Sequence, residues 1–587
     1  MNSLLLLILA LVGYWLAYRC YGRFIGRRIF ALAAGNRMPA HRYRDGVDFV
    51  PSKKHVVFGH HFTTIAGLGP IVGPAIGIIW GWLPALLWVV FGSIFMGAVH
   101  DFSAMVISAR NQGKTIGDLT GDIISPSTRL AFLVIIQFLL WLVLSIFAMI
   151  MGILFELYPA VVLPVWLQIP IAVGLGRCLR RGGNELLYSL AALALMYLSI
   201  LAGQYLPISL PPLLGSPVTS WAVLLFIYVS IASTLPIDIL LQPRDYINAQ
   251  QLLLTTGLLV LGVLAAHPTF SAPALNPAAF AAGSDIPPLF PLIFITIACG
   301  AISGFHSLAA SGTSVKQIDS EPDMLPIGFG SMLLEGLLAI VALIAIAGGL
   351  GLGLEKNGQL FFGADAYQVH YASWAGAQGL AAKIEAFVVG AANLMAGFGL
   401  PPHLGRALMA VFIVSFAGTT LDSATRIQRL SLQELCKNRD GLVARPFHNR
   451  TVATLVVVGL AALLTFIKPG AKGALVLWPL FGALNQLLAA LGLTVATVYL
   501  AQRGKNWLVT ALPMVFMLTV TVWAMADNLH KFLVRGDTLL VVLSIGIFTL
   551  TGWLLIGAAG ALRKVFGKGA AVAQEQDGDG EVSDFSS

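Results

Sequence analysis

The sequence predicts an all-α protein that crosses a membrane many times. Of its 587 residues, 57% are hydrophobic and only 11% are charged, whereas soluble globular domains usually carry about 25% charged residues. Apolar runs of about 20 residues, the length of a membrane-spanning helix, recur along the chain between short polar joints. Together with a mean hydropathy of +0.85, these observations leave little sequence for a soluble domain and exclude a soluble enzyme.

The positive charge of the chain indicates orientation in the membrane. The net charge is +8, but the Lys and Arg residues gather in a few joints between apolar runs, as the positive-inside rule describes. A nucleic-acid partner is therefore not expected. The four cysteines, Cys20, Cys178, Cys299 and Cys436, form neither a disulfide framework nor a CxxC metal site.

The N-terminal segment 1–20 is predicted to be a retained transmembrane helix. Its apolar run has no basic residue before it and no small-residue cleavage site after it, so it does not resemble a signal peptide. Nine basic residues lie between positions 19 and 54 and none before them. This predicts an outside N-terminus and a basic cytoplasmic loop at 21–54.

About 15 transmembrane helices are expected in all, and the C-terminus is then cytoplasmic. The remaining apolar runs lie near 56–82, 84–108, 129–157, 161–176, 186–206, 219–241, 251–267, 289–310, 327–353, 404–423, 450–468, 474–501, 506–527 and 537–562.

Two segments do not count as spans. Counting 381–399 would place the basic stretch after 426 outside, and the segment carries Lys383, Glu385 and Asn393, so we interpret it as re-entrant or lying at the surface. The acidic tail 569–587, rich in Gly and Ser, is predicted to be disordered and cytoplasmic.

Polar, Gly- and Pro-rich sequence interrupts two of the runs at mid-membrane depth, at 59–74 and at 300–313. Bare backbone groups are tolerated in a membrane only where they face protein or a watery cavity. Small residues also allow close helix packing, which is the alternative, but Pro70 and Pro74 remove backbone donors. We therefore expect both interruptions to line a shared binding cavity.

The order of these segments is that of an inverted repeat, in which broken helices bind substrate and ion near the midplane. A LeuT-type 5+5 core then places the interruptions in core helices 1 and 6 and the run 404–423 as core helix 8. The first half of the transport core is 55–206 and the second half is 289–501. Two inserted helices at 219–267 lie between the halves, and two C-terminal helices follow at 506–562.

Ionisable residues inside apolar runs usually mark a transport pathway. The candidates are His60, His61, His100, Asp101, Asp238, His306, Glu335 and Asp422. Histidine titrates near physiological pH, so the histidines in the two interruptions are candidates for a proton relay or for pairing with a substrate carboxylate. The alternative for each is a hydrogen-bonded packing residue.

The other polar candidates have more than one interpretation. Phe416, Thr419 and Thr420 share one helical face beside Asp422, which suits a sodium site, whereas a protonatable Asp422 suits a proton carrier. His100 and Asp101 are adjacent, so a direct pair is not expected. Asp101 is a candidate for ion coupling, and the alternative is that it meets Arg110 or a loop cation. Arg244 and Asp245 are placed in a cytoplasmic loop as an ion pair or gate latch, and Glu335 as a hydrogen-bonded anchor between helices.

Long stretches of the sequence resemble the carbon starvation (CstA) family of membrane transporters. They are VVFGHHFTTIAGLGPIVGPAIG (56–77), GAVHDF (97–102), QPRDY (242–246), CGAISGFHSLAASGT (299–313), TTLDSATRIQR (419–429) and WPLFGALNQLLAALG (478–492). The resemblance implies a bacterial inner-membrane symporter that takes up peptides or pyruvate during carbon limitation, driven by protons. Two departures are His100, where the family pattern has Gln, and a chain shorter than the longest members. They leave the ion chemistry around Asp101 and loop-dependent features open.

These arguments give three sets of candidate residues. The substrate-binding set is His61, Thr64, Gly67, Gly69, Gly73, Ser303, Gly304, His306 and Ser307. The ion-coupling set is His60, Asp101, Phe416, Thr419, Thr420 and Asp422. The gate or structural set is Arg244, Asp245 and Asn485.

We predict an ion-coupled transporter of a small carboxylate such as pyruvate, or of small peptides. H+ is favoured over Na+ as the coupling ion, with no cofactor and no metal site. The expected partners are the substrate and membrane lipid. The alternatives are a peptide-only transporter, a channel and a non-transporting nutrient sensor. Scattered carboxylates without a clustered catalytic set argue against an enzyme.

Overall fold

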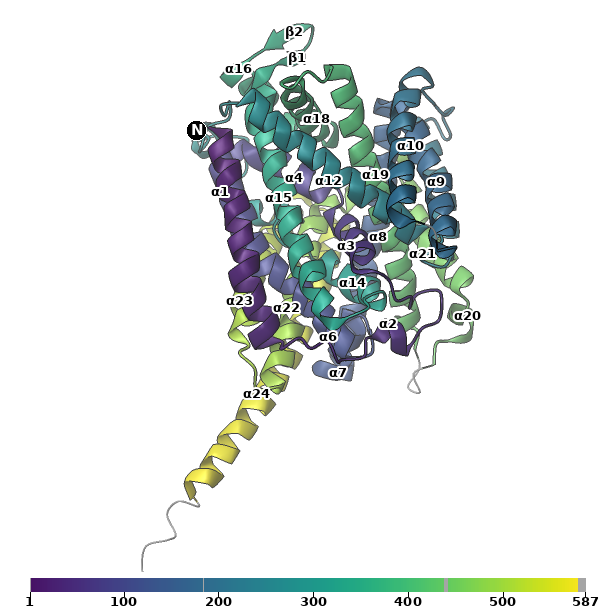
Figure 1. Cartoon of the computed structure of the whole chain (residues 1–587). Coiled ribbons are helices and arrows are strands. Elements are labelled where there is room, and N and C mark those ends of the chain that lie inside the picture. The colour runs from purple at the N-terminus through teal and green to yellow at the C-terminus, as the bar shows by residue number, and fades with distance from the viewer. Residues whose placement is uncertain (1, 183, 438–441, 579–587) are drawn as a thin grey trace, which may run out of the picture.

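Nearly parallel and antiparallel helices make up the computed structural model, which describes residues 2–182, 184–437 and 442–578 (Figure 1). Within these ranges, 12 helical stretches are long and apolar enough to cross a membrane. Two more helices, Pro217–Ala232 and Arg450–Phe466, are apolar but shorter. The structure therefore confirms a mostly helical, multi-pass membrane protein, while the total of about 15 spans stays a prediction.

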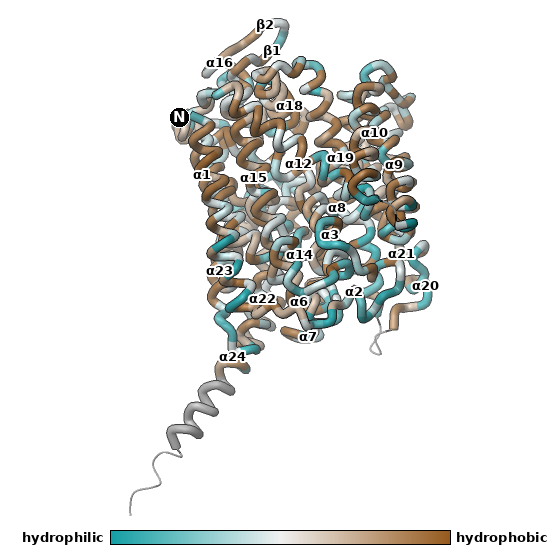
Figure 2. The backbone as a smooth tube through the Cα atoms, in the orientation of Figure 1, coloured by the Kyte–Doolittle hydropathy of each residue, from teal (hydrophilic) through white to brown (hydrophobic). Residues whose placement is uncertain are grey.

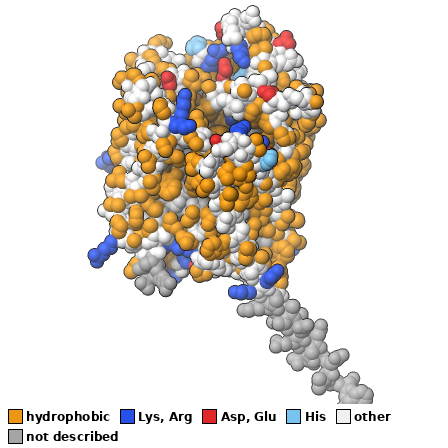
Figure 3. Space-filling view, turned by 180° about the vertical axis from the view of Figure 1, so that it is seen from behind, with side chains coloured by type: hydrophobic (Ala, Val, Ile, Leu, Met, Phe, Trp, Pro, Cys, Tyr) orange, Lys and Arg blue, Asp and Glu red, His pale blue; other side chains and the backbone are white. Residues whose placement is uncertain are grey.

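The surface of the bundle agrees with this assignment. Hydrophobic segments form its flanks, and the more hydrophilic ones gather towards its lower end, near α2 (Pro39–Arg42), α7 (Ile116–Ile123) and α20 (Arg445–His448) (Figure 2). In the view from behind, hydrophobic side chains cover most of the visible face (Figure 3). The N-terminus lies at the upper end of the bundle and α24 leaves it at the lower end (Figure 1).

The helices alternate with short connections along the whole chain. The first half forms α1 (Ser3–Leu16), α2 (Pro39–Arg42), α3 (Lys54–Ala66), α4 (Gly69–Gly77), α5 (Trp82–Gly92), α6 (Ala98–Arg110), α7 (Ile116–Ile123), α8 (Pro126–Leu157), α9 (Val162–Arg180), α10 (Glu185–Tyr205), α11 (Pro217–Ala232) and α12 (Leu241–Ala266). The second half forms α13 (Leu289–Thr296), α14 (Gly304–Gly312), α15 (Ser331–Ile344), α16 (Gly363–His370), α17 (Trp374–Ala377), α18 (Leu380–Ala396), α19 (Pro402–Leu435), α20 (Arg445–His448), α21 (Arg450–Phe466), α22 (Trp478–Gln502), α23 (Leu508–Arg535) and α24 (Thr538–Gly578). The strands β1 (Leu354–Lys356) and β2 (Gln359–Phe361) form an antiparallel hairpin that pairs Glu355 with Leu360.

The first helix is longer than predicted. α1 continues through two π-helical segments, η1 (Ala17–Gly22) and η2 (Ile25–Ile29), so the basic loop begins about ten residues after its predicted start at 21. Ile25 and Ile29 are buried and continue the apolar face. The Arg residues between them can remain in the helix because long basic side chains reach water from a helix end.

The boundaries of α11, α12 and α19 also differ from the prediction. α11 ends at Ala232, nine residues before the predicted end of the span 219–241, and the chain then bends through Pro236. α12 begins at Leu241, so the QPRDY segment 242–246 is helical and not a loop. α19 extends to Leu435, twelve residues beyond the predicted end at 423. The polar residues in these extensions are buried with partners, which a hydropathy pattern does not reveal.

The segments that were not counted as spans have different outcomes. α18 is a helix of 17 residues, shorter than the about 20 that a span needs, and it lies among the upper ends of the helices (Figure 1). Residues 569–578 of the predicted disordered tail belong to α24, since Ala, Gln and Glu favour helix. Residues 579–587 of that prediction lie outside the described residues.

Candidate functional site

The first predicted interruption is a sharp break between α3 and α4. The backbone at Gly67 has φ +27° and ψ −146°, a conformation that favours glycine. A Cβ at this position would also lie 3.0 Å from the Thr420 hydroxyl oxygen. Pro70 lies in the first turn of α4. A backbone N–H there would have no partner within the helix, so proline, which has none, is well suited to this position. The break is narrower than 59–74, because His60 and His61 lie in α3 and Gly73 lies in α4.

The second interruption runs between Thr296, the end of α13, and Gly304, the start of α14. Asn485 of α22 organises it: its Oδ1 accepts hydrogen bonds from the Ser303 hydroxyl and the Phe305 amide, both at 3.1 Å. The Trp88 indole donates to the carbonyl of Ile297, a buried residue of this break, at 2.8 Å. These contacts satisfy backbone groups that the break would leave bare. Phe305, His306 and Ser307, predicted to be unwound, lie in α14.

The two breaks lie directly against each other. A Cβ on Gly69 would be 2.2 Å from Cys299 Cβ, and a Cβ on Gly73 would be 3.1 Å from Ile297 Cα. Only glycine allows this approach. The predicted juxtaposition of the interruptions is therefore present, but in this conformation the backbones pack together and close the space between Gly69, Gly73 and the second break.

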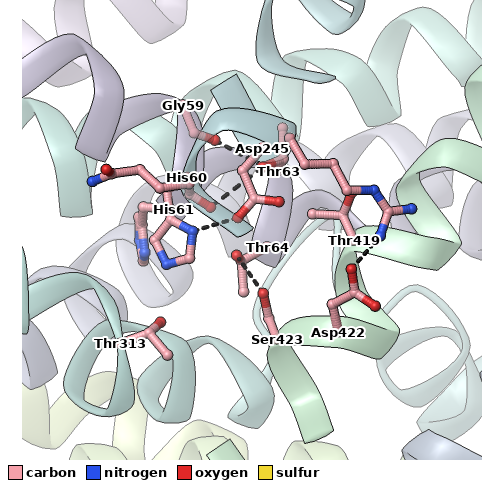
Figure 4. A network of polar contacts seen from close by, with 12 residues as sticks. Gly59, His60, His61, Thr63, Thr64, Asp245, Thr313, Thr419, Asp422 and Ser423 are labelled. Atoms are coloured by element: carbon pink, nitrogen blue, oxygen red, sulfur yellow. Dashed lines mark hydrogen bonds and ion pairs between the residues drawn. The ribbon is translucent and has the colours of Figure 1, made fainter. Parts of the chain in front are cut away.

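Two buried histidines of α3 are held by groups on other helices (Figure 4). His60 Nδ1 contacts the Asp245 carboxylate of α12, and both side chains are buried. His61 Nδ1 lies 2.9 Å from the Ser314 hydroxyl oxygen. The Nε2 atoms of both histidines lack a hydrogen-bond partner among the described residues. Each imidazole thus retains one nitrogen for a proton.

A second buried group surrounds the start of α14. The Asp101 carboxylate forms hydrogen bonds with His306 Nδ1 at 3.0 Å and with His100 Nδ1 at 2.8 Å. The expectation that His100 and Asp101 do not pair is wrong: both side chains are fully buried, and a buried carboxylate needs a partner. Asp101 meets these histidines and not a loop cation. Glu335 of α15 approaches His306 Nε2 at 3.5 Å.

The third buried group joins α12 to α19. Arg244 Nη1 contacts the Asp422 carboxylate and donates to the Tyr228 hydroxyl at 2.8 Å, and Tyr228 in turn donates to Asp422 at 2.8 Å. Arg244 Nε donates to Gln168 at 3.1 Å. The predicted loop placement of Arg244 and Asp245 is therefore wrong. Both are buried in the first turns of α12, because charge partners on α3 and α19 offset their burial.

A small cavity lies beside Arg244. About 10 Å³ of it is open to the centre of a water molecule, which is room for about one water. Its walls include Met151, Trp166, Tyr228, Arg244, Gly418 and Asp422. The indole N–H of Trp166 and the Asp422 Oδ1 atom lack partners among the described residues. Gly418 leaves room for the guanidinium, since a Cβ there would lie 2.5 Å from Arg244 Nη2.

The hydroxyl groups of α19 face the first break. Thr64 and Ser423 lie 3.2 Å apart through their hydroxyl oxygens, and Thr419 accepts from Asn248 at 2.6 Å. The Thr420 hydroxyl faces Gly67 and has no hydrogen-bond partner among the described residues. Phe416 is buried on the same helix. Ser307 and Gly304, also predicted, lie in the first turn of α14 and are linked by a 2.9 Å hydrogen bond.

The lower end of the bundle carries a separate charged cluster. Asp48 in the loop before α3 accepts from Arg426 at 2.7 Å and from Arg429 at 3.3 Å. Burial acts to raise the pKa of Asp48, but the charges of Arg429 and Arg426 outweigh it and lower the pKa to about 2. Asp238 lies apart from the central groups and pairs with Arg180 at 2.5 Å.

Sequence reasoning missed several partners of these groups. They are Gln168, Tyr228, Asn248, Ser314 and Ser423. Asn248 follows Arg244 by four residues, a spacing that places both on one helical face. That spacing would have identified a polar stripe on α12 if 242–246 had been read as helix.

Comparison with known proteins gives the family. Residues 2–524 match the family described as carbon starvation protein CstA. The Mycobacterium tuberculosis protein named peptide transporter CstA is 33% identical, covering 89% of this chain and 75% of that protein. The Escherichia coli pyruvate/proton symporter BtsT is 31% identical, covering 90% and 82%.

Among solved structures, a manganese transporter of Eremococcus coleocola aligns with a TM-score of 0.49 at 13% identity, covering 89% of this chain and 99% of that one. The match to the family over most of the chain, with relatives above 30% identity, decides the assignment. This protein belongs to the carbon starvation protein CstA family.

Proposed function

We propose that this protein is a secondary active transporter that imports a small carboxylate such as pyruvate, or small peptides, together with protons by alternating access. It works in the bacterial inner membrane with its N-terminus outside and its C-terminus in the cytoplasm. The names of the relatives, a peptide transporter and a pyruvate/proton symporter, support this class of function. The LeuT-type arrangement of two five-helix halves is part of the same proposal.

The observation that carries the proposal is a pair of histidine–carboxylate contacts, one on each interrupted helix. His60 of α3 contacts Asp245 of α12, and His306 of α14 contacts Asp101 of α6. Histidine changes charge near physiological pH, so gaining or losing a proton changes how firmly each half-helix is held. A proton can thus shift the balance between two conformations of the broken helices.

The group beside the cavity favours a small carboxylate. An Arg side chain binds carboxylates through paired N–H groups, and Arg244 and Asp422 both line the cavity, whose other walls are mostly aromatic and apolar. In this closed conformation the cavity has room for about one water, so it must widen to admit a substrate. We propose that Asp422 separates from Arg244 during the proton-coupled opening and frees Arg244 to bind the substrate carboxylate. A proton and a substrate anion then favour each other's binding, as a symporter requires. A peptide would need a larger space with an acidic partner for its amine.

The remaining candidate residues enter the proposal as predicted. The path that opens when the breaks separate is lined by the predicted substrate-binding residues, which lie in the two breaks and in the helices beside them: His61, Thr64, Gly67, Gly69, Gly73, Ser303, Gly304, His306 and Ser307. Sodium is the alternative coupling ion, and the unpaired Thr420 hydroxyl beside the first break is the observation that favours testing it.

Counterflow of labelled pyruvate in proteoliposomes tests this function. We expect labelled pyruvate to exchange without any gradient, and we expect a proton gradient to drive net accumulation that replacement of sodium by potassium leaves unchanged. Labelled di- and tripeptides are tested in the same vesicles, and empty vesicles serve as the control. If neither pyruvate nor peptides exchange under any proton or sodium gradient, the proposal fails.

A further inference from the structure

His306 lies between two carboxylates that come from two other helices. Its Nδ1 is 3.0 Å from Asp101 of α6, and its Nε2 is 3.5 Å from Glu335 of α15. All three side chains are fully buried. His306 is the third residue of α14, so this Asp101–His306–Glu335 triad adjoins the second break.

The hydrogen bonds of Asp101 fix where the imidazole protons lie. Each Asp101 oxygen faces one Nδ1 atom, from His100 at 2.8 Å and from His306 at 3.0 Å. An ionised carboxylate only accepts hydrogen bonds, so both Nδ1 atoms carry protons when Asp101 is ionised. His306 Nε2 is then the nitrogen whose protonation can change.

The contact between His306 Nε2 and Glu335 requires at least one proton. If neither His306 Nε2 nor the Glu335 carboxylate carried a proton, two hydrogen-bond acceptors would face each other. The buried triad would then hold two uncompensated negative charges, on Asp101 and Glu335, which is unfavourable at a low-dielectric site. One proton at this contact removes the opposition of two acceptors and one of the two negative charges, whether it resides on the imidazole or on the carboxyl group. This closed arrangement, in which all three side chains are fully buried, is therefore compatible only with a protonated contact.

Glu335 differs from a buried glutamate with a structural role. Glu321 is equally buried, and it accepts from Arg110 Nε at 2.8 Å, from Asn36 at 2.7 Å and from the Ala33 amide at 2.8 Å. Both Glu335 oxygens lack a hydrogen-bond partner among the described residues. The anchor role expected for Glu335 is thus not supported by any hydrogen bond that holds two helices together.

Buried groups on both breaks and on the first helix lie within electrostatic range of the triad. The charge of Asp101 acts at a distance on His61 of α3, and the charge of Glu335 acts at a distance on Cys299 in the second break and on Tyr14 of α1. His100 completes the titratable groups around it. A proton gained or lost here is felt at both interrupted helices.

We propose that the coupled proton binds between His306 Nε2 and Glu335, and that the broken helices close only when this proton is present. Glu335 then receives the proton from the side to which the site is open and releases it when α14 moves and water enters. This inference rests on the proposed proton-coupled transport and adds the residues that carry the proton.

The decisive variant is Glu335→Gln, which keeps the shape of the side chain and mimics its protonated form. At one proton per substrate, one pH unit drives about tenfold accumulation in the wild type. We expect E335Q to retain pyruvate counterflow within about threefold of the wild type, because exchange needs no change of protonation. We expect accumulation driven by the pH gradient to fall to the level of equilibration. Glu321→Gln is the matched control and is expected to keep the accumulation ratio.

Three outcomes are separable. If the wild type does not accumulate pyruvate under a pH gradient, the proposed function fails before the triad is tested. If the wild type accumulates it and E335Q does so equally, the triad proposal is overturned. If E335Q loses both activities, Glu335→Asp decides: accumulation with a shifted pH profile supports the proposal, and an unchanged pH profile overturns it.

Discussion

Replacing Gly69 by alanine tests the contact between the two breaks. The new Cβ would lie 2.2 Å from Cys299 Cβ and 2.4 Å from its Sγ, whereas carbon atoms in contact lie about 3.5–4.0 Å apart. The two breaks would have to separate by more than about 1 Å, and such overpacking of a core costs about 1–3 kcal/mol. We expect Gly69→Ala to lower the thermal unfolding temperature of the purified protein in detergent and to slow pyruvate counterflow.

A second substitution makes this prediction specific. Cys299→Gly removes both clashing atoms, and the nearest atom left to the new Cβ at position 69 is Cys299 Cα at 3.4 Å, an ordinary contact. Cys299→Gly alone should cost up to about 1 kcal/mol through backbone entropy, yet the double variant should be more stable than Gly69→Ala alone. Gly174, whose Cβ would meet nothing within 4 Å, is the control, and Gly174→Ala should be neutral or stabilising. If Gly69→Ala is as stable as the wild type, or if the two effects simply add, the breaks do not touch.

Three further predictions follow from the buried polar groups. Arg244→Gln and Asp422→Asn should each lower the free energy of unfolding by about 3–5 kcal/mol, because each leaves one buried charge unpaired. In thermal unfolding, the double variant should lie closer to the wild type than either single variant. Strictly additive effects would show that Arg244 and Asp422 do not interact. The pKa of Asp48 is lowered to about 2, so its ion pairs stabilise the fold above the unfolded pKa of about 4 and lose this effect as the pH falls through 2. Asp48→Asn should therefore unfold at a lower temperature than the wild type near neutral pH. The difference between the two unfolding temperatures should shrink towards pH 2. If the ion pairs of Asp48 contributed nothing, this difference would not depend on pH. Asn485→Ala should lower the free energy of unfolding by about 1–3 kcal/mol, because it leaves the buried Phe305 amide without its hydrogen-bond acceptor. Faster hydrogen exchange at that amide would show the loss, whereas unchanged exchange would exclude the hydrogen bond from Phe305 to Asn485.

The backbone features of the site were predictable because they depend on local chemistry. The backbone at Gly67 has a conformation that favours glycine, Pro70 lies in the first turn of α4, and Gly300 lies in the second break. The helix boundaries failed where polar residues were taken as loops, as for Arg244 and Asp245. Hydropathy along the chain cannot show that a buried charge has a partner, and here the partners are distant: His60 and Asp245 are 185 residues apart.

The closed space between the breaks was likewise beyond prediction. Glycine and proline indicate that the helices are interrupted, and the lipid then requires the bare groups to face protein or water. The conformation decides whether protein or water contacts these backbone groups. In the conformation of this structure, Gly69 and Gly73 pack on Cys299 and Ile297, so protein contacts them.

The position of the titratable contacts indicates which half of each broken helix responds to protons. α3 leads from the lower end of the bundle to the first break, and α14 leads from the second break back towards that end (Figure 1). The contacts of His60 and His306 with carboxylates hold α3 and α14 to the continuous helices α12 and α6. The other halves, α4 and α13, meet near Gly73 and Ile297 through close backbone packing, which does not change with pH. A change of protonation therefore loosens α3 and α14 while α4 and α13 stay packed, so the proton-dependent step of the proposed cycle is an opening towards the lower end of the bundle.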